Sequence, residues 1–163
     1  MQTPVYSFVA HSGTGKTTYL EGLIPALKAR GLRLGIVKHD AHDFDIDHEG
    51  KDSWRFARAG ADVTAVSSQT KTAVVRQGPP DLAGLMAGME DMDLILTEGY
   101  KHGPWPKILV HRAGTGRPPV LSPGLCAAAV SDEPLDTAAP LFPLDDPGPL
   151  ADWLAQRCGR RPI

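Results

Sequence analysis

The sequence predicts an α/β protein built on a mostly parallel, twisted β-sheet with helices on both faces and an antiparallel hairpin. Apolar runs rich in β-forming residues alternate with segments whose apolar positions have a helical period, which is typical of strand–helix–strand units. The length of 163 residues fits one domain, so we expect a single domain over 1–163. Eleven of the 15 prolines follow residue 100, which makes 113–163 a proline-rich C-terminal part of it.

The first strand and helix are the clearest local predictions. Residues 5–9 form a short apolar run and are predicted to be a buried strand. Leu20, Leu23, Ile24 and Leu27 recur on one helical face, and Gly31 ends that helix. Pro25 lies inside the pattern and should kink the helix, because it lacks a backbone donor.

The rest of the chain continues the alternation of strands and helices. The run 32–37 has few polar residues, which suits a parallel strand covered on both faces. The pair of runs within 62–76 is predicted to be the antiparallel hairpin. The other expected elements are helices over 51–61, 81–89 and 150–157, and strands over 93–97, 107–111, 125–130 and 139–142.

The most specific motif is the stretch Ala10–Thr18, which fits the phosphate-loop pattern GxxxxGK[ST] with alanine at its first position. It stands between a predicted strand and a predicted helix, as the motif requires. Glycines let the backbone N–H groups turn toward phosphate oxygens, the lysine adds a positive charge, and the next hydroxyl can bind Mg²⁺. The sequence therefore predicts a P-loop NTPase domain whose nucleotide-binding residues are Ser12, Gly13, Thr14, Gly15, Lys16, Thr17 and Thr18.

An acidic partner for the metal is expected at the end of another buried strand. Glu98 follows the run 94–96 at its C-terminal end, which is the edge where ligands bind in open α/β sheets. Asp93 enters the same strand at the opposite end and is the less favoured candidate. Gly99 would allow close approach of the backbone to a γ-phosphate.

The loop 38–52 is dense in histidine and carboxylate side chains. Its spacing excludes an EF-hand, because His48 stands where glycine is needed and Trp54 where a glutamate is needed. The loop leaves the strand that follows the phosphate-binding helix, so it should overhang the nucleotide. Asp40, near that strand end, is therefore predicted to reach the Mg²⁺ shell.

The base of the nucleotide is not fixed by the residues, since no Asn-Lys-x-Asp motif occurs. Asp132 follows a late buried strand and has two readings of equal weight. Its carboxylate would accept hydrogen bonds from guanine N1 and N2, or it would cap a turn.

Composition and charge exclude several classes of function. A formal net charge of −2 argues against a protein that holds nucleic acid through a dense basic surface. The longest strictly apolar run is 125–130, too short to span a bilayer, so no membrane partner is expected. The two cysteines form no CxxC pair and no leader pattern opens the chain, so we predict a cytoplasmic protein.

An ordered series of motifs across residues 4–112 resembles the MobB-type molybdopterin-guanine dinucleotide biosynthesis adapter proteins. After the phosphate loop the matching stretches are 23–25, 37–39, 44–47, 50–53, 59–61, 97–101 and 106–108. Two departures are Glu49, where proline is common in the family, and Asp40-Ala41-His42, which breaks a His-rich run.

The resemblance implies a GTP- and Mg²⁺-binding protein that hydrolyses GTP slowly and forms a homodimer. It also implies an accessory role beside the guanylyltransferase that joins GMP to molybdopterin. Glu98 and Asp40 are then the candidates beside the metal or the attacking water, and no arginine finger in cis is apparent.

Two alternatives stay open at this point. One is a small-molecule kinase in which Arg112 and Arg117 form a lid, and its ATP turnover would rise with one small substrate. The other is an interaction module that keeps only the fold, and its partner binding would survive Lys16→Ala.

Overall fold

The computed structural model describes residues 3–39, 44–79 and 81–159. These residues form two compact units, one of residues 1–39 and 87–163 and one of residues 40–86. The larger unit holds β1 (Val5–Val9), α1 (Lys16–Ala29), β2 (Leu34–Lys38), β5 (Leu94–Glu98), β6 (Lys107–His111), β7 (Ala128–Ser131), β8 (Leu141–Pro143) and α4 (Gly148–Arg157), with the 3₁₀ turns η1 (Ala113–Thr115) and η2 (Pro123–Leu125).

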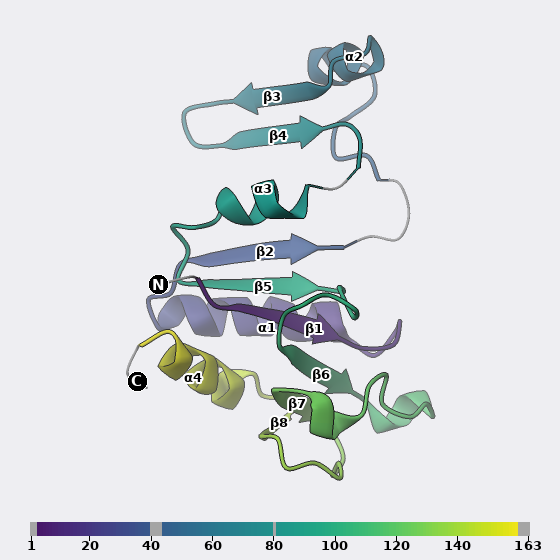
Figure 1. The fold of residues 1–163 in the computed structure, drawn as a ribbon, viewed down its shortest axis with the longest axis vertical. Coiled ribbons are helices and arrows are strands. Elements are labelled where there is room, and N and C mark those ends of the chain that lie inside the picture. Colours follow the sequence, from purple (N-terminus) through teal and green to yellow (C-terminus); the bar gives the residue numbers. More distant parts are fainter. Residues whose placement is uncertain (1–2, 40–43, 80, 160–163) are drawn as a thin grey trace. The chain divides into compact units, whose positions relative to one another are not determined.

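The larger unit is built on a six-stranded sheet with the order β2-β5-β1-β6-β7-β8 (Figure 1). Each neighbouring pair in that order is parallel, which confirms the mostly parallel sheet predicted from the sequence. The strand that leads into the phosphate loop, β1, therefore lies in the middle of the sheet, between β5 and β6. All six C-terminal strand ends lie along one edge.

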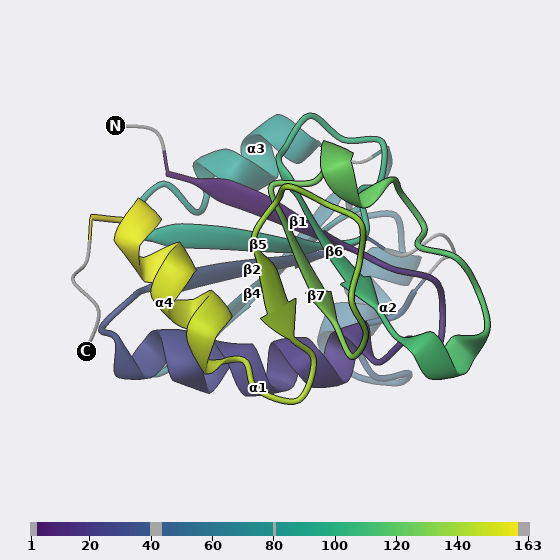
Figure 2. The same cartoon turned by 90° about the horizontal axis from the view of Figure 1, so that it is seen from below.

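Both faces of the sheet are buried at its inner strands, since side chains that point to opposite sides along β5, β6 and β7 are nearly all buried. Phe8 and Ile108 pack with α1 and α4 in one apolar cluster, whereas their neighbours Val9 and Leu109 belong to another. Figure 2 shows α1 and α4 together on one side of the sheet. The sequence predicts helices on both faces. In the larger unit the second face is covered by the segment 120–126, which includes η2, and by Met89 against Gly35.

Helix α1 runs through Pro25 without ending there, and it stops at Arg30 as Gly31 takes a positive φ of 76°. Its buried face, Leu20, Leu23 and Leu27, is the face that the sequence pattern predicts. Tyr19 is also buried on α1, and burial raises the pKa of its hydroxyl well above the ordinary value, with the Asp146 carboxylate adding to the shift. Tyr19 therefore stays neutral and acts as a core residue.

The smaller unit contains α2 (Asp52–Arg58), β3 (Val63–Ser67) and β4 (Thr72–Arg76). The two strands pair antiparallel, which confirms the predicted hairpin. A third helix, α3 (Leu82–Ala87), begins in this unit and ends at the first residue of the next segment of the larger one. Both α2 and α3 are shorter than the predicted helices over 51–61 and 81–89. None of the helices in the described part of the chain is long and apolar enough to cross a membrane.

Candidate functional site

The loop that follows β1 has the backbone shape of a phosphate loop. Gly13 and Gly15 have φ values of 80° and 94°, in the left-handed region that only glycine adopts without strain. Gly15 is also the N-cap of α1, and no side chain caps that helix end. The loop thus leaves the first N–H groups of α1 without a side-chain partner, where the positive end of the helix dipole favours an anion.

Hydrogen bonds within the loop hold its shape. The Thr14 hydroxyl donates to the His11 carbonyl oxygen at 2.9 Å, and Thr14 is almost fully buried. This side chain therefore points into the protein rather than toward a ligand. Ser12 and Thr18, two further predicted binding residues, are exposed on the loop and on the first turn of α1.

Glu98, at the end of β5, meets the first turn of α1. The Thr17 hydroxyl donates to Glu98 Oε1 at 2.9 Å, and Lys16 Nζ lies 3.5 Å from the same oxygen. Strand register explains the meeting, because Glu98 pairs with Phe8 on β1, two residues before the loop begins. The structure therefore brings Glu98 to two other predicted site residues, of which Thr17 is 81 positions away in the sequence.

The Lys16–Glu98 ion pair is largely shielded from solvent. The side chains are only 18% and 15% exposed, so their attraction is screened less than that of a surface pair. Both donors use Oε1, and Oε2 takes no hydrogen bond from the residues that the structure describes. Oxygen atoms of a hydroxyl and a carboxylate are the hard ligands that Mg²⁺ takes. The donor set therefore fits the predicted magnesium.

Gly99 serves a tight turn after β5. Its φ is 95°, and a Cβ atom there would lie 3.2 Å from the Cβ of His39. Its N–H donates to the Phe8 carbonyl at 3.2 Å. The next residue, Tyr100, has a positive φ of 52°, and its ring packs against His39 at 4.8 Å and Trp105 at 5.4 Å. This aromatic cluster beside Glu98 was not predicted from the sequence.

Arg112 braces the phosphate loop from the end of β6. Its Nε donates to the Thr14 carbonyl oxygen at 3.0 Å, and its Nη2 would lie 3.1 Å from a Cβ at Gly15. From the sequence, Arg112 is expected only as part of a kinase lid. The sequence feature that could have indicated the contact of Arg112 with the loop is its position directly after β6, which pairs with β1.

Asp132 follows β7, and one of its oxygens is engaged in a turn. Oδ1 accepts a hydrogen bond from the Ala113 N–H at 2.8 Å. Its turn-capping role is thus present, and the predicted contact with guanine stays a prediction. Asp40 lies outside the described residues, as does the rest of 40–43. Among the residues that are described, no group of three or more His, Cys, Asp or Glu side chains is arranged to hold a metal.

A strand–phosphate loop–helix unit in a parallel sheet, with an acidic residue at the end of the adjacent strand, defines the P-loop class of nucleotide-binding folds. The chain matches over residues 5–132 the family described as molybdopterin guanine dinucleotide synthesis protein B, MobB. The chain belongs to this family. The family match thus confirms the resemblance to MobB-type proteins that the motifs of the sequence indicate.

Individual relatives agree with that placement. The chain is 43% identical to the molybdopterin-guanine dinucleotide biosynthesis adapter protein of Escherichia coli K12, over 94% of this chain and 92% of that protein. It is 35% identical to the Haemophilus influenzae adapter protein, over 94% and 88% of the two chains. Among solved structures, MobB of Bacillus subtilis superimposes with a TM-score of 0.72 at 28% identity, covering 94% of this chain and 97% of that one.

Proposed function

We propose that this protein is a GTP-binding accessory protein of molybdopterin guanine dinucleotide biosynthesis, which assists the guanylyltransferase. The observation that carries the proposal is the meeting of Lys16, Thr17 and Glu98 at the phosphate loop of a MobB-family chain. The Escherichia coli relative, which matches nearly the whole chain, is called an adapter protein. An adapter is also the better match to a chain whose larger unit is taken up by the nucleotide-binding fold.

Each residue of the site has a role in this proposal. Lys16 and the loop N–H groups bind the phosphates, and Thr17 with Glu98 holds Mg²⁺, which when bound supplies positive charge to the β- and γ-phosphates. Glu98 must release Lys16 toward the phosphates when the nucleotide enters, since the two are paired at 3.5 Å without it. Asp40, Gly99 and Asp132 remain candidates for the metal, the γ-phosphate and the base.

Hydrolysis by this site should be slow. Glu98 Oε1 is held by Thr17 and Lys16, and Arg112 is anchored to the Thr14 carbonyl rather than free to follow a developing charge. Assisted GTPases reach about 10 s⁻¹. A steady-state rate of that size for the purified chain would contradict the proposal.

The proposed function predicts a selective nucleotide and a defined partner. Calorimetric titrations with GTP and ATP in Mg²⁺ should give tighter binding of GTP. The tagged chain should also co-purify with a molybdopterin guanylyltransferase and raise its yield of the dinucleotide cofactor. Equal affinity for both nucleotides, or no effect on the transferase, would contradict the corresponding half of the proposal. The proposal places this activity in the cytoplasm.

We also propose that the chain forms a homodimer through the unit 40–86. No described residue of this unit is buried, and most of the large exposed apolar side chains among the described residues belong to it. On one face of the hairpin Ala65 pairs with Val74, which is 62% exposed, and Val63 lies on the same face at 40%. A two-stranded hairpin is marginal in water, so cover by a second copy would stabilise it.

Val74→Lys tests the dimer. A charge in the middle of this face would be costly to bury, so the variant should sediment as a monomer where the wild type sediments as a dimer. Gln69→Lys, in the turn between the strands, adds the same charge away from the face and should leave the dimer intact. A monomeric wild type, or a dimer that survives Val74→Lys, would refute the proposed interface.

A further inference from the structure

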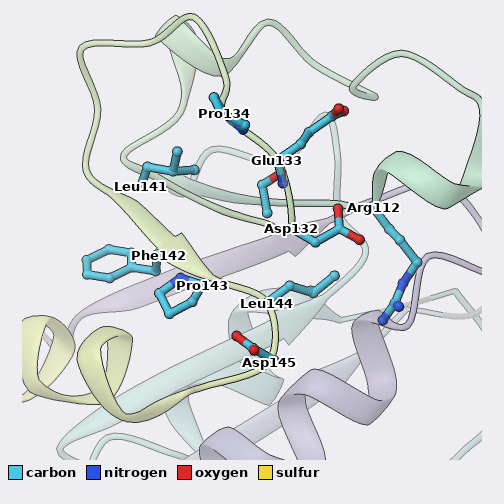
Figure 3. Close-up of a pocket in the computed structure, with 10 residues that line it drawn as sticks. Arg112, Asp132, Glu133, Pro134, Leu141, Phe142, Pro143, Leu144 and Asp145 are labelled. Carbon is cyan, nitrogen blue, oxygen red and sulfur yellow. The ribbon is translucent and has the colours of Figure 1, made fainter.

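A cavity of about 580 Å³ opens at the C-terminal ends of β7 and β8, on the edge of the sheet that also carries the phosphate loop. Its lining combines apolar side chains, among them Leu141, Phe142 and Leu144, with the charged side chains of Arg112, Asp132, Glu133 and Asp145 (Figure 3). A volume of this size is typical of small-molecule sites, and the charged groups of the lining could orient a polar ligand.

Arg112 connects the cavity to the phosphate loop. Its side chain lines the cavity, and its Nε donates to the Thr14 carbonyl at 3.0 Å. Figure 3 shows this side chain reaching from the cavity toward the first turn of α1. Arg112 thus lies between the phosphate loop and the cavity, so the two are neighbours on this edge of the sheet.

The two aspartates of the cavity differ in what they already bind. Asp132 Oδ1 accepts the Ala113 N–H at 2.8 Å, which fixes the turn after β6. The Asp145 carboxylate takes no hydrogen bond from any residue that the structure describes, and it is exposed at the cavity. Glu133, the third carboxylate of the lining, has its Oε1 hydrogen-bonded to His111 Nε2 at 2.7 Å. Asp145 is therefore the carboxylate of the lining whose two oxygens are both available to a ligand.

Backbone contacts on both sides of Asp145 fix its position. Leu144 N–H donates to the Ser131 carbonyl at 3.2 Å, which ties the end of β8 to the end of β7. On the other side of Asp145, the N–H of Gly148, the first residue of α4, donates to Asp146 Oδ1 at 2.8 Å. Asp145 lies between these anchors, so its placement does not depend on a long mobile loop.

Guanine presents two adjacent donors, N1–H and the N2 amino group, and an ionised carboxylate can accept both at once. Adenine presents an acceptor at N1, which a carboxylate repels. We infer that the cavity holds the nucleoside half of the bound nucleotide and that Asp145 is the residue that selects guanine. This inference rests on the proposed GTP binding, and it makes Asp132 a positioning residue for the turn after β6.

Asp145→Asn tests whether Asp145 selects guanine, because the variant replaces one acceptor oxygen of the carboxylate with an amide NH₂ donor. The variant should bind GDP about 10- to 100-fold more weakly. It should gain affinity for xanthosine diphosphate, whose C2 carbonyl accepts a hydrogen bond from the new amide. The measurement is calorimetric titration of the full chain with GDP, ADP, xanthosine diphosphate and inorganic pyrophosphate. Pyrophosphate affinity should not change, because the phosphate loop is untouched.

Matched variants separate the possible outcomes. Asp136→Asn, outside the cavity lining, should behave as the wild type, and Asp132→Asn should not gain xanthosine diphosphate. Unchanged GDP affinity in Asp145→Asn, a switch carried by Asp132→Asn, or a wild type that binds ADP as well as GDP would each overturn the inference. Pyrophosphate binding by the wild type in those cases would leave the phosphate-loop proposal standing, whereas failure to bind any of the four would refute both.

Discussion

Lys16→Ala should lower the affinity of the protein for GTP by roughly 10- to 150-fold. Lysine in this position places its positive charge next to the phosphates. A hydrogen bond to a charged group typically contributes about 1.5–3 kcal/mol to the free energy of binding. The Lys16 side chain is only 18% exposed, so its charge acts in a poorly screened site. Isothermal titration with GTP in Mg²⁺ measures the loss directly.

A loss of GTP affinity in Lys16→Ala is informative only if the variant is folded. Lys16 pairs only with Glu98 among the described residues, and neither side chain belongs to the apolar core, so the variant should keep the thermal midpoint of the wild type within a few degrees. Lys71→Ala is the matched control, since Lys71 is exposed in the hairpin turn. Unchanged GTP affinity in Lys16→Ala would refute the phosphate-loop assignment, and partner binding that survives the variant would favour the interaction module.

Glu98→Gln should raise the Mg²⁺ concentration needed for half-maximal GTP turnover by about 10- to 100-fold, the usual cost of removing a residue that supports a metal site. The amide oxygen of glutamine can still accept the Thr17 hydroxyl, so the change removes the charge and keeps the shape. Binding of GTP without metal should not weaken, because the variant also frees Lys16 from its ion pair.

A shifted Mg²⁺ titration together with unweakened metal-free GTP binding identifies Glu98 as a residue that supports the metal site. A variant that merely misfolds would lose metal-free GTP binding as well as turnover. Glu90→Gln, at an exposed glutamate outside the site, should leave both titrations unchanged. An unaltered Mg²⁺ titration in Glu98→Gln would instead favour Asp93 or Asp40 as the metal-binding carboxylate.

Local patterns predicted most strands well and one of them poorly. The runs 5–9 and 107–111 match β1 and β6, because apolar β-forming residues bounded by loops have few other uses. The run 125–130 was predicted as a strand, but the structure begins β7 at Ala128. Leu125 ends the 3₁₀ turn η2 and is 82% exposed. An apolar run does not reveal which of its residues face solvent, and Pro123 and Gly124 favour the turn.

Part of the candidate site could also be predicted from the sequence, and part could not. The phosphate loop and Glu98 were predictable, because each lies at a strand end within a local motif. Arg112 and Asp145 carry no such motif. Arg112 reaches Thr14 across 98 positions of sequence, and Asp145 faces the cavity only because β8 lies beside β7.

The sequence by itself determined the local conformation of the loop, since glycine at positions 13 and 15 permits the positive φ values that turn its N–H groups toward an anion. It also determined most of the strand and helix segments, through the period of their apolar residues, although not all of their bounds. Only the tertiary structure decided the strand order, because the local period is the same for every parallel arrangement of buried strands. That order places Glu98 on one side of the loop and Arg112 on the other.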